Sequence, residues 1–202
     1  MASEHGREGG RVGVPKMIYT FGDSHAWHCW LKIKNTMPFS PGPMTLYHFG
    51  FYKPVMTSKV PLEDVVVFSY GEIDCRCQIH KFPPWEETID KLVENYKLAL
   101  DANAVGRDPK RVWVNYGVPP PRRDGLPHVE AENPDYPFLG SDQERLSFVR
   151  RMNDGLKKLP YTYIDLYDQY ADKDGFLNPA MSDDQCHVSD PKPLQEWVNA
   201  HT

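Results

Sequence analysis

Short apolar runs ending in glycine or proline alternate with helical segments along most of this 202-residue chain. The glycines favour sharp turns where a strand gives way to a helix. Strands are predicted over 17–22, 44–50, 65–70, 111–117 and 161–166. Helices are predicted from Thr88 to a cap at Gly106, from Ser141 to Leu159 before Pro160, and from Asp190-Pro191 onward. This alternation predicts a three-layer α/β domain with a parallel sheet of about five strands.

Charge and hydropathy exclude several classes of protein. The chain carries 23 basic and 28 acidic residues, a net charge of −5, and lacks a long run of like charge, which argues against nucleic acid as a partner. Its longest clean apolar run, Val65-Val66-Val67-Phe68, is far shorter than the roughly 20 residues of a membrane span. We therefore expect no membrane association. For the domain organisation, we expect a disordered leader over 1–15 followed by one domain over 16–202.

The cysteines indicate the compartment. Four cysteines and a polar N-terminus without a secretion signal predict reduced thiols in a cytoplasmic protein. Cys75, Cys77 and His80 have ligand-like spacing, but a structural zinc site needs a fourth ligand and usually another spacing. We expect these cysteines to be buried packing residues and predict no metal.

In open parallel sheets, ligands bind at the carboxyl ends of the strands. Two polar motifs are candidates for this region, one after a predicted strand and one before a predicted helix. Gly22-Asp23-Ser24-His25 follows the first predicted strand and presents a serine at a helix start, beside backbone N–H groups. Asp184-Gln185-Cys186-His187 precedes the last helix. Serine, histidine and aspartate can form a triad in any chain order, so Ser24, His187 and Asp184 are the candidate nucleophile, base and orienting carboxylate.

With these motifs the chain resembles the GDSL-type, or SGNH-hydrolase, esterases and acyltransferases. The resemblance rests on Gly22-Asp23-Ser24-His25, Gly50, Gly71-Glu72-Ile73-Asp74 and Asp184-x-x-His187, in that order. It implies a flavodoxin-like three-layer fold and a serine esterase, plausibly for an acetyl group on a carbohydrate, that needs no cofactor. It also implies that the N–H groups of Ser24 and Gly50 form the oxyanion hole, and we assign substrate binding to Asp23, His25, Glu72 and Asp74.

The third block departs from the family pattern. Ile73 stands where the family usually has an asparagine that donates to the oxyanion, and losing one such donor can cost about 10²–10³ in rate. Arg76, the only cation in 70–79, is the hypothesised replacement, unless the two backbone donors suffice or the chemistry is not ordinary ester hydrolysis.

Other functions stay open at this point. The same site could serve a sugar O-acyltransferase, and Ile73 could mark a glycan-binding module without catalysis. Asp23-x-His25 also resembles the first metal motif of calcineurin-like metallophosphoesterases, although that family's later motifs are missing. Aromatic residues near the ends of the first three strands could stack on sugars, namely Trp27, His28, Trp30, Tyr47, His48, Phe51, Tyr52 and Trp85.

Overall fold

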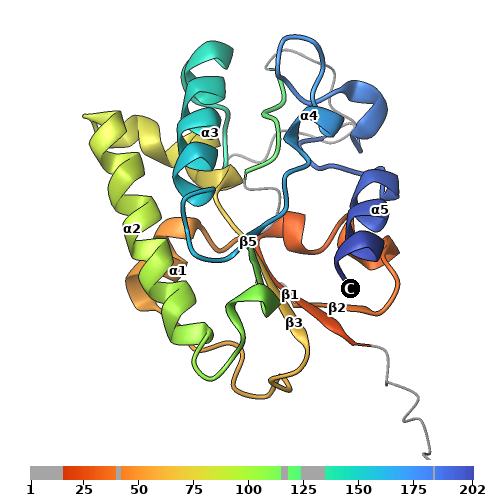
Figure 1. The fold of residues 1–202 in the computed structure, drawn as a ribbon. Coiled ribbons are helices and arrows are strands. Elements are labelled where there is room, and N and C mark those ends of the chain that lie inside the picture. The colour runs from red at the N-terminus through yellow and green to blue at the C-terminus, as the bar shows by residue number, and fades with distance from the viewer. Residues whose placement is uncertain (1–15, 40–41, 115–117, 124–134, 184) are drawn as a thin grey trace, which may run out of the picture.

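Five parallel strands form the centre of the protein, shown in Figure 1 as a computed structural model that describes residues 16–39, 42–114, 118–123, 135–183 and 185–202. The strand order is β2-β1-β3-β4-β5, and every neighbouring pair is parallel. The strands are β1 (Ile18–Gly22), β2 (Thr36–Phe39), β3 (Val65–Ser69), β4 (Val112–Val114) and β5 (Thr162–Tyr163). The predicted fold class is therefore confirmed.

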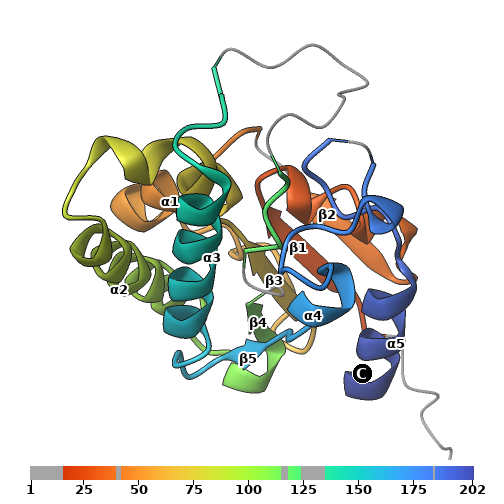
Figure 2. The same cartoon turned by 90° about the horizontal axis from the view of Figure 1, so that it is seen from above.

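Helices cover both faces of the sheet (Figures 1 and 2). The helices are α1 (Leu46–Tyr52), α2 (Trp85–Asn103), α3 (Asp142–Leu156), α4 (Tyr167–Tyr170) and α5 (Lys192–His201). Val66 and Phe68 of β3 pack in the cluster that contains residues of α1, α2 and α3, whereas Val65 and Val67 pack in the cluster that contains residues of α5. Burial on both faces explains why β3 reads as one continuous apolar run.

Local signals in the sequence mark two helix starts correctly. The Ser141 hydroxyl accepts from the Glu144 N–H, and the Glu144 carboxylate accepts from the Ser141 N–H, which completes the capping box before α3. Before α5, Asp190 Oδ1 accepts from the Lys192 N–H at 2.9 Å. The first long helix begins at Trp85, slightly before the predicted Thr88.

The predicted strand over 44–50 is wrong, because this segment forms α1. The Thr45 hydroxyl accepts from the His48 N–H, and the Asp74 carboxylate accepts from the N–H groups of Leu46 and Tyr47. These acceptors satisfy backbone donors that every helix start leaves without an intrahelical partner. The aromatic residues favoured a strand in the sequence, but the capping acceptors decide for a helix.

The second strand is instead β2, which the sequence analysis missed. It pairs with β1 at the edge of the sheet and contains Pro38. Proline is tolerated in an edge strand because its missing N–H need not serve a second neighbour. The prolines around this segment made it resemble a loop.

Several expectations concern residues outside the described ranges, namely the leader over 1–15 and the end of the predicted strand at 115–117. The four cysteines are all free, and Cys75 and Cys77 are buried. Within the described ranges, no helix combines the length and the apolar character needed to cross a membrane.

Candidate active site

Ser24 lies on a tight turn at the carboxyl end of β1. A Cβ on Gly22 would lie 1.9 Å from the Ser69 carbonyl oxygen, so only glycine fits where β1 passes β3. The Asp23 N–H donates to the same oxygen at 3.1 Å. Ser24 then begins a single helical turn, Ser24–Ala26, and its own N–H has no intrahelical acceptor.

His187 lies on a compact loop before α5. Asp183 Oδ1 accepts from the backbone N–H groups of Gln185 and His187, at 2.9 and 3.2 Å. The Asp183 N–H donates to the His187 carbonyl oxygen at 3.2 Å. These bonds fold the loop back on itself and place the Asp183 carboxylate beside the His187 ring.

Two hydrogen bonds connect Ser24, His187 and Asp183. Asp183 Oδ2 lies 2.7 Å from His187 Nδ1, and His187 Nε2 lies 2.9 Å from Ser24 Oγ. The structure therefore brings the predicted nucleophile and base together. The carboxylate at the ring is Asp183, whereas the predicted Asp184 lies outside the described residues. The two aspartates are adjacent; the Asp-x-x-His spacing of the resemblance selects Asp184, and the hydrogen bond described here comes from Asp183.

Asp183 is ionised over the physiological pH range. Burial alone would raise the pKa of Asp183, but the hydrogen bond and charge of His187 and the two backbone donors lower it to about 2. A carboxylate at Nδ1 favours the tautomer in which Nδ1 carries the proton, because the carboxylate can only accept. His187 Nε2 is then free to accept the Ser24 hydroxyl proton.

Two more histidines flank His187. The His28 ring stacks on the His187 ring at 3.9 Å with 12° between their planes. The His25 ring lies on another side, 5.1 Å from His187 and tilted by 51°. Partial burial and the neighbouring His187 lower the pKa of His28, which keeps its ring neutral near pH 7. Sequence analysis did not predict that three imidazoles meet here, because His25 within the motif and His28 just after it lie more than 150 residues before His187 in the chain.

The structure does not support the predicted oxyanion residue Gly50. Gly50 lies in α1, where its N–H belongs to the helix ladder, and a Cβ there would meet Asn95 of α2 at 3.0 Å. Its small size serves close packing between two helices. Ile73, in the asparagine position, is buried, and its side chain has no donor.

Arg76 contacts Glu72 and not Ser24 in the described part of the chain. Arg76 Nε lies 2.8 Å from Glu72 Oε1, and Nη2 donates to Oε2 at 3.0 Å. Nη1 donates to the Tyr136 carbonyl oxygen at 2.9 Å. This ion pair with one hydrogen bond orients both side chains, so the hypothesised roles of Arg76 as oxyanion donor and of Glu72 as substrate ligand gain no support from these contacts.

Asp74 is a structural residue and not an exposed substrate ligand. Its side chain is fully buried and accepts from the Leu46 and Tyr47 N–H groups at 2.7 and 3.1 Å. Burial raises the pKa of Asp74 to about 7 despite these two donors, which act in the opposite direction. Asp74 thereby joins the segment after β3 to the start of α1.

One group of potential metal ligands coincides with this site. Ligand atoms of His28, Asp183 and His187 all lie within 4.8 Å of one another. However, the two stacked rings keep their in-plane lone pairs in separate, nearly parallel planes, and such lone pairs converge poorly on one ion. Asp183 Oδ2 and His187 Nδ1, 2.7 Å apart, already form a hydrogen bond and lie too close to be two tetrahedral ligands at about 2.0–2.2 Å from a zinc ion. The arrangement fits hydrogen bonding better than metal binding.

Within the described ranges, the residues of the other two metal hypotheses do not form a cluster of possible metal ligands. Cys77 Sγ donates to the Ile73 carbonyl oxygen, and Cys75 and Cys77 do not form a ligand group with His80. Asp23 and His25 contact each other, with Asp23 Oδ1 accepting from the His25 N–H at 2.9 Å. Neither belongs to a group of possible metal ligands there, as the metallophosphoesterase motif would require.

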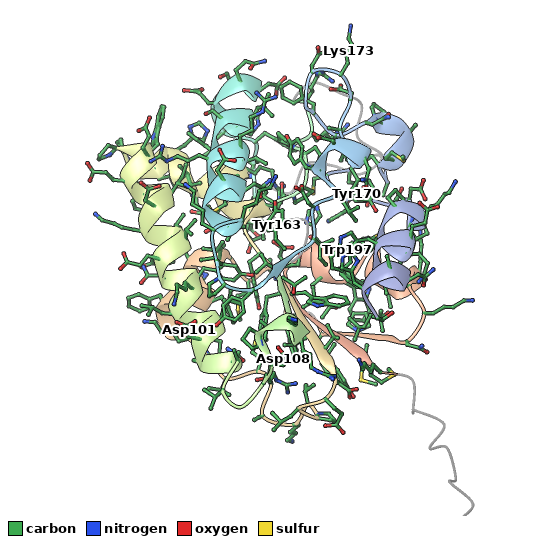
Figure 3. All side chains as sticks on the ribbon, viewed as in Figure 1. Asp101, Asp108, Tyr163, Tyr170, Lys173 and Trp197 are labelled. Carbon is green, nitrogen blue, oxygen red and sulfur yellow. The ribbon has the colours of Figure 1, made fainter. Side chains whose placement is uncertain are left out.

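Residues of α4 and α5 hold the chain segment that follows His187. Figure 3 labels Tyr170 of α4 and Trp197 of α5. The Tyr170 hydroxyl donates to the Asp190 carbonyl oxygen at 3.1 Å. The Trp197 ring meets Trp113 of β4 edge to face at 5.0 Å. These contacts hold the segment after His187 against the sheet, which preserves its distance from Ser24.

An open cavity of about 500 Å³ lies between α1, α2 and the segment after β3. Exposed aromatic residues border it, including Tyr47 and Phe82, together with the polar side chains of Lys91 and Asn95. Trp27 on the Ser24 turn is also exposed, whereas Trp30 is fully buried and cannot contact a ligand. The predicted set of sugar-stacking aromatics is thus reduced to its exposed members.

No family model matches the sequence, and no curated protein matches it. Solved structures do match it in fold. A GDSL-like lipase from Bacteroides thetaiotaomicron has a TM-score of 0.59 and 16% identity, with 92% of this chain and 86% of that chain covered. A carbohydrate acetylesterase family member from Sinorhizobium meliloti has a TM-score of 0.58 and 16% identity, with 92% and 98% covered.

Phospholipase A1 from Streptomyces albidoflavus is a third similar structure. Its TM-score is 0.55 at 11% identity, with 93% of this chain and 99% of that chain covered. The three proteins share one architecture, and this chain has the same SGNH-hydrolase fold. Identities this low establish the fold, while the chemistry must be argued from the site itself.

Proposed function

We propose that the protein is a serine ester hydrolase in which Ser24 is the nucleophile, His187 the general base and acid, and Asp183 the orienting carboxylate. The observation that carries this proposal is the chain of two hydrogen bonds, 2.9 Å from Ser24 Oγ to His187 Nε2 and 2.7 Å from His187 Nδ1 to Asp183. The similar fold of three ester-hydrolase structures supports it.

The reaction follows from these positions. His187 Nε2 takes the Ser24 hydroxyl proton as Oγ attacks the ester carbonyl, and Asp183 stabilises the resulting imidazolium. The imidazolium then protonates the leaving alcohol, which leaves an acyl group on Ser24. Water attacks this acyl-enzyme with His187 again as base, releasing the acid and restoring Ser24.

We assign the oxyanion hole to backbone N–H groups, beginning with that of Ser24, which has no intrahelical acceptor. The resemblance gave the second donor to Gly50, but that N–H belongs to the ladder of α1, Ile73 has no side-chain donor, and Arg76 pairs with Glu72. In place of Gly50 we propose Gly42, which follows β2 with a φ of 102°, a conformation that glycine adopts readily.

The proposed substrate is a small acyl ester, an acetyl group on a carbohydrate. Trp27, exposed three residues after Ser24, and the exposed aromatic rings on α1 can stack on sugar faces. The fold is also that of a carbohydrate acetylesterase family member. A phospholipid-like ester is the competing substrate. A preference for short or for long acyl chains distinguishes the carbohydrate acetate from this phospholipid-like ester.

The test measures hydrolysis of 4-nitrophenyl acetate and octanoate with and without EDTA, for the wild type, Ser24→Ala and Ser147→Ala. We expect acetate to be preferred, Ser24→Ala to fall to background, and Ser147→Ala, altered on the exposed surface of α3, to equal the wild type, in both conditions. Equal background rates in all three proteins in both conditions would refute ester hydrolysis, and activity that is lost only when EDTA is added would favour metal chemistry.

A second measurement follows acetate release from an O-acetylated oligosaccharide, with and without an added sugar acceptor. Release that depends on Ser24 supports the carbohydrate ester. Transfer of the acetyl group to the acceptor in preference to water would instead identify an O-acyltransferase that uses the same residues. Binding of the oligosaccharide without turnover would identify a glycan-binding module.

A further inference from the structure

His25 is a buried histidine that the proposed reaction does not use. Only 2% of its surface is exposed, and it adjoins Ser24 in the nucleophile turn. Its Nε2 lies 3.1 Å from the carbonyl oxygen of Cys186, the residue directly before His187. Its Nδ1 lies 3.3 Å from Asp23 Oδ1. Both ring nitrogens therefore face oxygen atoms that can only accept.

This arrangement joins the two halves of the site a second time. The first connection is the Ser24–His187 hydrogen bond, and the second runs from His25, the residue after Ser24, to Cys186, the residue before His187. A carbonyl acceptor requires that Nε2 carries a proton. Two neighbouring contacts restrict the relative position of two loops more strongly than one contact alone.

We propose that His25 is a positioning residue that ties the Ser24 turn to the His187 loop through its Nε2–H bond to the Cys186 carbonyl oxygen. This inference rests on the proposed function. Because Cys186 and His187 are consecutive, the bond fixes the peptide that carries the base. It thereby holds His187 Nε2 within hydrogen-bond distance of Ser24 Oγ.

The charges around His25 favour the donor role of its Nε2. Asp23 faces it from its own turn, Glu72 from the segment after β3, and Cys186 and His187 from the loop before α5. Burial would lower the pKa of His25, but Asp23 and Glu72 raise it above its usual value. Protonation places a hydrogen on both ring nitrogens, so the charged form of His25 donates from Nε2 to the Cys186 carbonyl oxygen.

The test compares His25→Gln with His25→Met, two side chains of similar length of which only glutamine can donate to Cys186. The exposed His201→Gln is the control. The readouts are kcat and KM for 4-nitrophenyl acetate, the rate at which a fluorophosphonate labels Ser24, and the melting temperature.

We expect His25→Met to lower kcat by about 10- to 100-fold with little change in KM, because a misplaced base slows the chemical step. His25→Gln should recover most of kcat and of the labelling rate. A purely structural role would lower the melting temperature of both variants without this difference between them in kcat and labelling rate.

Equal kcat and labelling rates in the Gln and Met variants would overturn the positioning role, as would wild-type behaviour of both. Unfolding of both variants at the assay temperature would assign His25 to stability and also overturn it. If Ser24→Ala keeps full activity, the proposed function fails. If Ser24→Ala is inactive while the two His25 variants agree, only the inference about His25 fails.

Discussion

At the residue scale, two adjacent aspartates show what a motif can and cannot predict. The sequence predicted correctly that Ser24 and His187 are neighbours. Ser24 follows a strand at the carboxyl edge of the sheet, and His187 lies in the loop before a helix. The partner of His187 Nδ1 could not be settled from spacing, since Asp183 and Asp184 both precede the histidine. The choice depends on how the loop closes, which the Asp183 carboxylate determines by accepting two backbone N–H groups.

Asp183→Asn and Asp184→Asn form a matched pair that tests this assignment. We expect Asp183→Asn to lower kcat by about 10³–10⁴, because an amide in place of the carboxylate favours the wrong tautomer of His187. Asp184→Asn should retain activity close to that of the wild type. The measurement is kcat at pH 7.5 with 4-nitrophenyl acetate, and a larger loss in Asp184→Asn would return the role to that residue.

At the scale of elements, α1 shows how a long-range contact overrides local preference. Leu46, Phe49 and Gly50 have helical spacing and are the buried residues of α1, yet the aromatic content of the segment favours a strand. The deciding contact comes from Asp74, 27 and 28 residues later in the chain. No window around α1 contains that information. By contrast, α3 carries its own capping box and was predicted from local sequence.

The Asp74 contact predicts a specific pH dependence of stability. A carboxyl whose pKa rises from 3.8 in its ordinary state to about 7 on folding binds its proton more tightly in the folded protein. Its contribution to stability is therefore fully present below about pH 4 and is lost as the pH rises through 7. Urea unfolding from pH 5 to 8 should show this decline in the wild type.

The control for this experiment is Asp74→Asn, which has no titrating group at the position. We expect its free energy of unfolding to change less over the same pH range, even though it also loses one backbone hydrogen bond at the start of α1. Parallel pH profiles of the two proteins would contradict the raised pKa.

At the scale of the whole molecule, the order and direction of the strands place the site. The continuous apolar run of β3 predicted a central strand, and β3 is the middle strand of the five. The edge strand β2 was missed because it is short and contains Pro38, so the usual sequence signals of a strand are absent from it. The meeting of three histidines could not be predicted, since it needs the positions of both chain segments and not only the fold class.

Strands β1 and β3 lie very close to each other at Gly22, and a substitution at this position tests how much that close packing contributes to stability. Gly22→Ala should destabilise the protein by at least about 1–3 kcal/mol, because the new Cβ would collide with the Ser69 carbonyl oxygen. Gly106→Ala is the comparison, since a Cβ there meets Leu62 only at 3.8 Å and the cost is the left-handed φ of 76°, roughly 1–2 kcal/mol. Urea midpoints measure both, and a smaller effect at Gly22 would contradict the packing.

The hydrogen bond between Ser24 and His187 joins residues 163 positions apart. Closing so long a loop carries an entropic cost that nearby contacts do not share. During synthesis the nucleophile emerges 163 residues before its base. A partly synthesised chain can therefore form the strands and helices around Ser24 and still lack hydrolytic capacity, so the onset of activity reports that the His187 loop has docked.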